Sequence, residues 1–173
     1  MKKRNIILSI LLMLTLVFFA ACGSKTSKET SDDSLKTMSF QHSSPGNNVI
    51  YTFYYEDGSD EVLKQETINT MSYEMFGVDS AEEAKEKVAP FVEQYQGLKG
   101  VEHEISYEDT YLKEFVMVDY SQVDLKEVKN IVGFELDNEN ATYISLEQST
   151  APLKAQNSGF EEVKDGKFKE FEE

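Results

Sequence analysis

Residues 49–73 read VIYTFYYEDGSDEVLKQETINTMSY, and this stretch decides the fold class. Its first part alternates in polarity, and one predicted strand face is formed by Val49, Tyr51, Phe53 and Tyr55. Asp57-Gly58 then marks a tight turn, because glycine accepts the positive φ that a hairpin turn requires. The mixed-polarity run after the turn is typical of a returning strand. The stretch therefore predicts an antiparallel β-hairpin.

The next segment changes from strand to helix and back. Ser80 followed by Glu83 forms a capping box, and apolar residues recur at helical spacing as far as Tyr95. Pro90 predicts a kink or a break near residues 87–89, because proline lacks the N–H used in a helix interior. Residues 101–120, VEHEISYEDTYLKEFVMVDY, alternate again and predict a second hairpin.

The C-terminal third predicts helices and a short extended piece. Residues 123–133 and residues 145–157 carry apolar groups at helical spacing. The sequence FEEVK, residues 160–164, predicts the extended piece, and residues 165–173 predict a frayed tail. The expected fold is therefore α+β: an antiparallel sheet of two β-hairpins with helices packed on one face, in the order ββα-ββα-α, with a short C-terminal extended piece.

The first 21 residues have the features of a secretory signal peptide. Three cations within residues 1–4 precede an apolar run over residues 6–21. A helix of that length rises roughly 24 Å at about 1.5 Å per residue, which is short of the ~30 Å hydrocarbon core of a bilayer. This pattern favours a cleaved leader over a permanent membrane span.

The single cysteine, Cys22, follows Ala20 and Ala21 and precedes Gly23. This arrangement resembles the lipobox of bacterial lipoproteins, with Phe19 where that pattern usually has Leu. The resemblance implies a diacylglyceryl group on the Cys22 thiol and cleavage just before it. The alternative is an ordinary signal peptide whose removal leaves a free thiol. Two acyl chains suffice for stable anchoring, so we expect a lipid-anchored protein at the extracytoplasmic face of a bacterial membrane.

The chain is strongly acidic, with 32 Asp and Glu against 17 Lys and Arg and a net charge of −15. Loss of Lys2, Lys3 and Arg4 with the leader removes three positive charges and no negative ones, and −15 becomes −18. Such a chain is a poor nucleic-acid binder, and anionic headgroups should repel it, so the lipid must hold it at the membrane. A well-solvated surface explains the acidity, and a site for divalent or cationic ligands is the alternative.

Composition predicts four segments: a signal peptide over residues 1–21, lipidated Cys22 and a flexible polar tether over residues 22–48, a single α+β domain over residues 49–164, and the tail over residues 165–173. The tether prediction rests on a run rich in Ser, Thr, Lys and Asp, which has too few apolar groups to offset the entropy of ordering.

Three stretches of the predicted domain are EVLKQET at residues 61–67, GVEHEISYEDTYLKEFVMVDYSQVDLKEV at residues 100–128, and SGFEEVK at residues 158–164. In this order they resemble the YehR-like lipoproteins of bacteria, over roughly residues 49–164. The resemblance implies a compact α+β domain built on an antiparallel sheet. It brings no catalytic residue and no ligand.

Enzymatic chemistry is not expected. The two histidines are His42, in the predicted tether, and His103, on the apolar face of a predicted strand. The sequence lacks the nucleophile elbow, the zinc-protease helix, the phosphate loop and the dinucleotide glycine pattern. We therefore expect no catalytic residue and no cofactor.

A metal site is not expected either. Strand alternation sends Glu102 and Glu104 to the face opposite His103, so the three cannot share an ion. Residues 56–61 and 137–140 gather oxygen ligands of the kind that Ca²⁺ takes, but neither matches an EF-hand, and turn residues explain both.

Two residues are weak candidates for ligand binding. Tyr54 falls on the minority face of the first hairpin and is expected to be exposed, while the other aromatic residues beside it pack the core. His103 is expected to be a half-buried structural histidine or a ligand-binding group. The function favoured is a non-enzymatic module that binds a small ligand or an envelope protein. The alternative is a structural lipoprotein for envelope maintenance without a small-molecule site.

Overall fold

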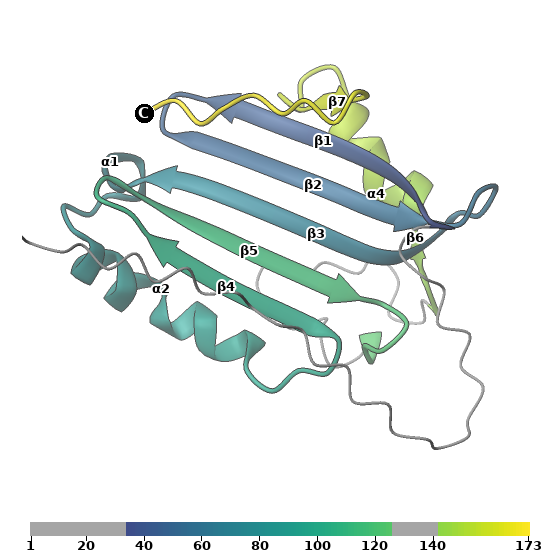
Figure 1. Ribbon diagram of the computed structural model, residues 1–173, viewed down its shortest axis with the longest axis horizontal. Helices are drawn as coiled ribbons and strands as arrows, with labels where there is room; N and C mark the ends of the chain where they lie inside the picture. The colour runs from purple at the N-terminus through teal and green to yellow at the C-terminus, as the bar shows by residue number, and fades with distance from the viewer. Residues whose placement is uncertain (1–33, 126–141) are drawn as a thin grey trace, which may run out of the picture.

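The computed structural model describes residues 34–125 and 142–173, which build one antiparallel sheet with helices packed against it (Figure 1). The strands lie in the spatial order β4-β5-β3-β2-β1-β7, and β6 pairs with the start of β3. The elements are β1 (Lys36–Ser44), β2 (Asn47–Tyr55), β3 (Glu61–Ser72), α1 (Tyr73–Phe76), α2 (Ala81–Tyr95), β4 (Val101–Tyr107), β5 (Tyr111–Asp119), β6 (Ile144–Ser145), α4 (Leu146–Lys154) and β7 (Glu161–Val163).

Strand β1 lies inside the segment that composition predicted to be a tether, so that prediction is wrong from Lys36 onward. All nine residues of β1 pair with β2. Phe40 is 1% exposed and belongs to the core. The alternating pair Met38 and Phe40 is enough for a strand whose neighbours supply the remaining apolar surface, and average composition does not reveal such a pair. The remainder of the predicted tether, together with Cys22, lies outside the described residues.

The hairpin predicted at residues 49–73 is confirmed as β2 and β3. Gly58 occupies the turn with φ +79°. The register pairs Ile50 with Ile68 and shifts at a bulge between Tyr54 and Tyr55. The predicted element order is wrong, because β1 makes the first unit a three-stranded meander rather than a hairpin, and because α1 and β6 are additional elements.

Helix α2 begins as predicted and runs through its proline. The Ser80 hydroxyl accepts from the Glu83 N–H at 3.3 Å, and the Glu83 carboxylate accepts from the Asp79 N–H at 3.0 Å. The helix is continuous over Ala81–Tyr95, so of the kink or break predicted near residues 87–89 the break does not occur. Apolar side chains pack against the sheet both before and after Pro90, which offsets the one hydrogen bond that proline cannot donate.

The second predicted hairpin, β4 and β5, is also confirmed. Exposure alternates residue by residue along β4, as a strand with one packed face requires. Gly100, directly before β4, has φ +76°, and a Cβ there would lie 2.9 Å from the Asp119 carbonyl oxygen. The hairpin therefore depends on a close backbone approach that only glycine allows.

Helix α4 is shorter than the predicted span of residues 145–157 and ends at Lys154. The Ser158 hydroxyl donates to the Leu153 carbonyl at 2.7 Å and satisfies one of the last carbonyls of the helix. Strand β7 follows where an extended piece was predicted, and it pairs with β1. His42, predicted in the tether, lies in β1, and its Nδ1 is 2.9 Å from the Gly159 carbonyl oxygen. The helix predicted at residues 123–133 lies mostly outside the described residues.

Both long helices pack on the same face of the sheet, as predicted, and each covers a separate core cluster. The cluster beneath α4 contains Phe40, Phe53, Val62 and Leu146. The cluster beneath α2 contains Tyr73, Ala84, Val88 and Leu112. Figure 1 shows α2 beside β4, at one edge of the sheet, and α4 near β7, at the opposite edge. We call the side of the sheet that both helices cover the helix face. The opposite side, which carries Ile50, Ile68 and Phe115, is called the second face.

The C-terminal segment is not frayed, so that prediction is also wrong. The side chain of Gln41 donates to the Lys169 carbonyl and accepts from the Lys169 N–H, both at 2.8 Å. The Gly46 N–H donates to the Glu172 carbonyl at 2.8 Å, and the Phe171 ring lies 4.9 Å from that of Tyr111. The buried Gln41 side chain and the turn between β1 and β2 thus hold a segment that has little apolar content of its own. Figure 1 shows this segment running along β1.

Candidate functional site

The strand register gathers two rows of side chains in the middle of the helix face. In one row Val49 lies opposite Asn69, which lies opposite Glu114, which lies opposite Ile105. Directly paired residues of antiparallel strands point to the same side, so these four side chains share one surface. The neighbouring row runs in the same way through Tyr51, Thr67, Val116 and His103.

A groove with a volume of about 370 Å³ lies over these rows, between α2 and the sheet. Helix α2 supplies Val88, Phe91, Val92 and Tyr95 to its lining. The strands and the segments next to them supply Val49, Tyr51, Gln65, Thr67, Asn69, Met71, Phe76, Val101, Ile105, Leu112, Glu114, Val116, Val118 and Tyr120. The volume falls at the lower end of the range, about 300–1,000 Å³, that is typical of small-molecule sites.

The polar side chains of the groove form its floor and come mainly from β3. Gln65, Thr67 and Asn69 alternate along that strand and so point to the same side. The Tyr120 hydroxyl donates to Gln65 Oε1 at 3.1 Å, and Gln65 Nε2 donates to Thr67 Oγ1 at 3.4 Å. A hydrogen-bonded polar line therefore crosses a mostly apolar groove.

Asn69 and Glu114 continue this line with acceptor oxygens. Asn69 Oδ1 is buried and has no hydrogen-bond partner among the described residues. Glu114 Oε1 lies 2.8 Å from His103 Nε2. Because an ionised carboxylate only accepts, His103 donates through Nε2. A buried acceptor without a partner costs about 1–3 kcal/mol, and a ligand donor would recover that free energy.

His103 and the tyrosines set the electrostatic character of the groove. The His103 ring stacks on Tyr95, with centroids 4.4 Å apart and 20° between planes. Burial raises the pKa of Tyr51, and burial together with the Glu114 carboxylate raises the pKa of Tyr95. Burial also raises the pKa of Tyr120. These phenols stay neutral across the physiological pH range and can act as hydrogen-bond donors.

The structure separates the two candidates that the sequence singled out. The His103 side chain is 7% exposed and lies on the helix face, where it contacts a groove carboxylate. Tyr54 lies on the second face, away from the groove. It is half-buried rather than exposed, because its hydroxyl donates to Glu66 at 2.8 Å and Lys64 Nζ sits 4.1 Å above its ring.

The acidic turn at residues 56–61 is occupied by helix capping. The Asp60 carboxylate accepts from the Ser145 hydroxyl at 2.7 Å and from the Glu147 N–H at 2.8 Å. These hydrogen bonds, that from Ser145 first, lower the Asp60 pKa. Among residues 34–125 and 142–173, no group of three or more His, Cys, Asp or Glu side chains is arranged to hold a metal ion. Residues 137–140, the other oxygen-rich run, lie outside the described part of the chain.

Sequence reasoning missed the four floor residues Gln65, Thr67, Asn69 and Glu114. A signal was present, because Gln65, Thr67 and Asn69 alternate in the strand that returns from an aromatic hairpin. Their side chains must therefore share a face with some of the aromatic residues of β2. Pairing with Glu114 depends on the β3–β5 register, which joins segments far apart in the sequence.

Comparison with known proteins identifies the family of this chain. A family model described as "Protein of unknown function (DUF1307)" matches residues 36–161. The chain belongs to this family. The uncharacterized lipoprotein YehR of Escherichia coli K12 is 32% identical over 166 residues, which cover 95% of this chain and 100% of that protein. The uncharacterized lipoprotein Lmo0207 of Listeria monocytogenes is 31% identical over 163 residues, which cover 94% of this chain and 97% of that protein.

A solved structure agrees with the fold. The NMR structure of E. coli YehR matches with a TM-score of 0.64 at 30% identity, over 77% of this chain and 94% of that one. The antiparallel α+β domain is thus shared within the family, and the resemblance to the YehR-like lipoproteins is confirmed. The names of the relatives support a lipoprotein with a membrane-anchored location. In the part of the chain that the structure describes, no helix is both long and apolar enough to span a bilayer.

Proposed function

We propose that this YehR-like lipoprotein is a non-enzymatic ligand-binding module, lipid-anchored through Cys22 at the extracytoplasmic face of the membrane. The observation that carries the binding role is the groove of about 370 Å³ over the helix face. It combines apolar walls with a few convergent polar groups, which is the composition of small-molecule sites in general. Anchoring through Cys22 is supported by its lipobox-like context and by the names of the relatives.

The kinds of side chain in the groove favour binding over catalysis. The described residues that line it include no Ser, Cys or Lys, which are the common nucleophiles of covalent catalysis. The one carboxylate, on Glu114, is hydrogen-bonded to His103. A His–carboxylate pair without a Ser or Cys among the described lining residues can orient a ligand but lacks the usual third partner of a hydrolytic triad.

Blocking the groove tests the proposal. Thr67→Tyr places an aromatic side chain on the groove floor, in the middle of β3, where an aromatic residue suits a strand. Thermal unfolding of the chain is measured against a panel of small apolar and amphipathic compounds. A compound that binds the native state at a hundredfold excess over its Kd stabilises it by about 2.7 kcal/mol.

We expect at least one compound class to raise the melting temperature of the unmodified chain and to lose this effect in Thr67→Tyr. Ile68→Tyr is the matched control, since Ile68 is the next residue of the same strand and points to the second face. The control should keep the stabilisation. Stabilisation that survives in both variants would place binding away from the groove, and a panel without any shift would contradict the proposed function.

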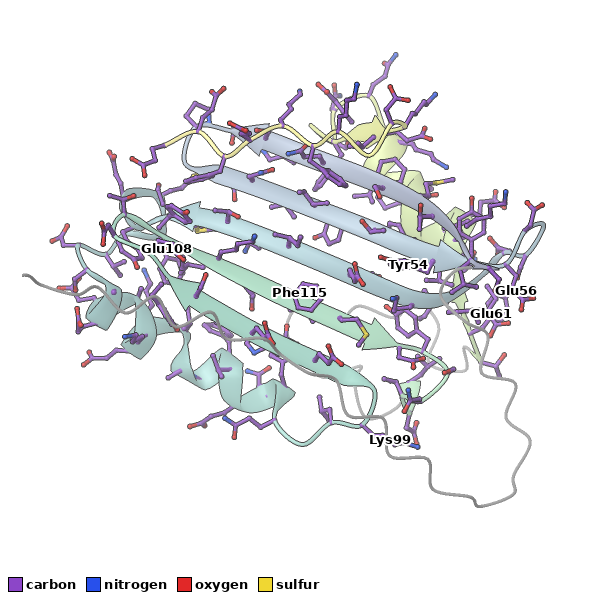
Figure 2. The ribbon with its side chains drawn as sticks, viewed as in Figure 1. Tyr54, Glu56, Glu61, Lys99, Glu108 and Phe115 are labelled. Atoms are coloured by element: carbon purple, nitrogen blue, oxygen red, sulfur yellow. The ribbon has the colours of Figure 1, made fainter. Side chains whose placement is uncertain are left out.

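A protein partner is the second candidate, and the second face of the sheet favours it. Ile50, Ile68 and Phe115 lie side by side across β2, β3 and β5, and all three are half-buried. Figure 2 shows Phe115 at the middle of this face. An apolar row of this kind suits contact with another envelope protein. Phe115→Ser would then abolish recovery of that partner after crosslinking in cells while leaving groove ligands unaffected.

A further inference from the structure

The charge of the groove is one-sided. Among the described residues that line it, Glu114 is the one charged side chain, and neither Lys nor Arg is present. Lys87 reaches the rim, where its Nζ lies 4.6 Å from the Phe76 ring, and its ammonium donates to the Phe76 carbonyl. The whole chain carries a net charge of −15, so the surrounding potential has the same sign as the groove carboxylate.

The floor of the groove also carries hydrogen-bond acceptors that its described residues leave unused. Asn69 lies directly opposite Glu114 in the β3–β5 register, so their side chains are neighbours on the floor. Asn69 Oδ1 is a buried oxygen without a partner in the described chain, and Glu114 has a second carboxylate oxygen besides the one that His103 engages. Both sites accept hydrogen bonds, so a complementary ligand must donate.

Aromatic rings add to this preference. Tyr51, Tyr95 and Tyr120 line the same groove. The face of an aromatic ring attracts a cation, by about 0.5–1 kcal/mol at exposed sites and about 2 kcal/mol or more where the cation is desolvated. A carboxylate would meet the opposite: repulsion from Glu114 and no cationic partner in the lining.

We infer that the groove selects apolar ligands that carry an amine, and that it discriminates against ligands of the same size that carry a carboxylate. This inference rests on the proposed binding function and specifies its ligand class. The protonated amine lies against the Glu114 carboxylate, and the apolar body lies between α2 and the strands. Fatty acids, which a protein at a membrane surface meets in abundance, are thereby excluded.

Three probes with one eight-carbon chain and different head groups test the inference: n-octylamine, n-octanol and octanoate. Isothermal titration calorimetry gives each Kd on the processed chain from residue 22 onward, with Cys22→Ser to prevent acylation. This chain keeps every described residue. The solved structure of YehR matches 77% of this chain with 94% of its own, so the matched part is enough for the fold. The titrations are run at pH 8, where the amine of octylamine is protonated and octanoate is ionised.

The expected result is a Kd for octylamine at least tenfold lower than that for octanoate, with octanol between them. Glu114→Gln, which keeps the shape of the side chain and removes its charge, should reduce this difference to less than threefold. Glu102→Gln also removes one negative charge, but from a residue of β4 that points to the second face, and should leave the difference between the two Kd values unchanged. That control separates a local effect of Glu114 from the general effect of net charge.

The outcomes distinguish a failure of amine selectivity from a failure of ligand binding in the groove. Octanoate binding as tightly as octylamine, or a tenfold amine preference that survives in Glu114→Gln, would overturn the amine selectivity while leaving groove binding intact. Failure of all three probes to bind would count against the proposed function itself, and the amine inference would fall with it.

Discussion

Replacing Phe40 tests the most consequential correction that the structure makes. If residues 22–48 were a tether, truncating Phe40 would leave the stability of the domain unchanged. In the structure Phe40 is 1% exposed and packs edge-to-face on Phe53, with ring centroids 6.4 Å apart and planes at 71°. Deleting a buried Phe side chain costs about 3–5 kcal/mol, which includes the cavity left behind.

That cost should be easy to measure. For a domain of this size each kcal/mol corresponds to roughly 3–5 °C, so Phe40→Ala should lower the melting temperature by about 10–25 °C. Domains are stable by only about 5–15 kcal/mol, so Phe40→Leu is prepared as a milder variant with an expected loss of about 1–2 kcal/mol. Urea denaturation followed by far-UV circular dichroism gives the free energy of unfolding for each variant.

Phe168→Ala is the matched control, because Phe168 is 41% exposed. Its free energy of unfolding should stay within about 0.5 kcal/mol of the unmodified chain. A loss of less than about 1 kcal/mol for Phe40→Ala would contradict the burial of Phe40, since it would mean that β1 is not packed in the core.

Two other predictions concern backbone features. Gly100→Ala should cost about 2–3 kcal/mol of unfolding free energy, because a φ of +76° is combined with a Cβ 2.9 Å from the Asp119 carbonyl oxygen. Gly97→Ala, at a φ of +75° with open space around it, should cost only about 1 kcal/mol. Equal losses in chemical denaturation would contradict the close approach at Gly100. Deleting residues 166–173 should cost about 1–3 kcal/mol of unfolding free energy, because Gln41, which is 4% exposed, loses its main-chain hydrogen-bond partners. Lys169→Ala keeps those main-chain bonds and should be near neutral. An unchanged melting temperature after the deletion would mean that the segment frays.

The β-hairpins could be predicted because their signals are local. Alternation in residues 49–55 and 101–107 states which side of each strand is buried, and Asp57-Gly58 states where the chain turns. The capping box at Ser80 likewise fixed the start of α2. Each of these features depends on residues a few positions apart, so no knowledge of distant partners is needed.

The errors arose where stability comes from partners far away in the sequence. Strand β1 and the C-terminal segment both have polar compositions and were therefore predicted to lack fixed structure. Phe40 gains its packing from β2 and α4, and Gln41 gains its hydrogen bonds from Lys169, 128 residues later. Composition averages over a segment and so cannot register a single buried contact of this kind.

The sequence by itself determined the antiparallel α+β class, the acidic surface and the lipobox-like context of Cys22, because alternation, charge and short motifs are properties of consecutive residues. Only the tertiary structure decided that Asn69 lies beside Glu114 and that Tyr54 points away from both. Register is the physical reason. A shift of one residue between β3 and β5 would move every floor side chain to the other face, and that register is fixed by pairing between strands that the local pattern does not connect.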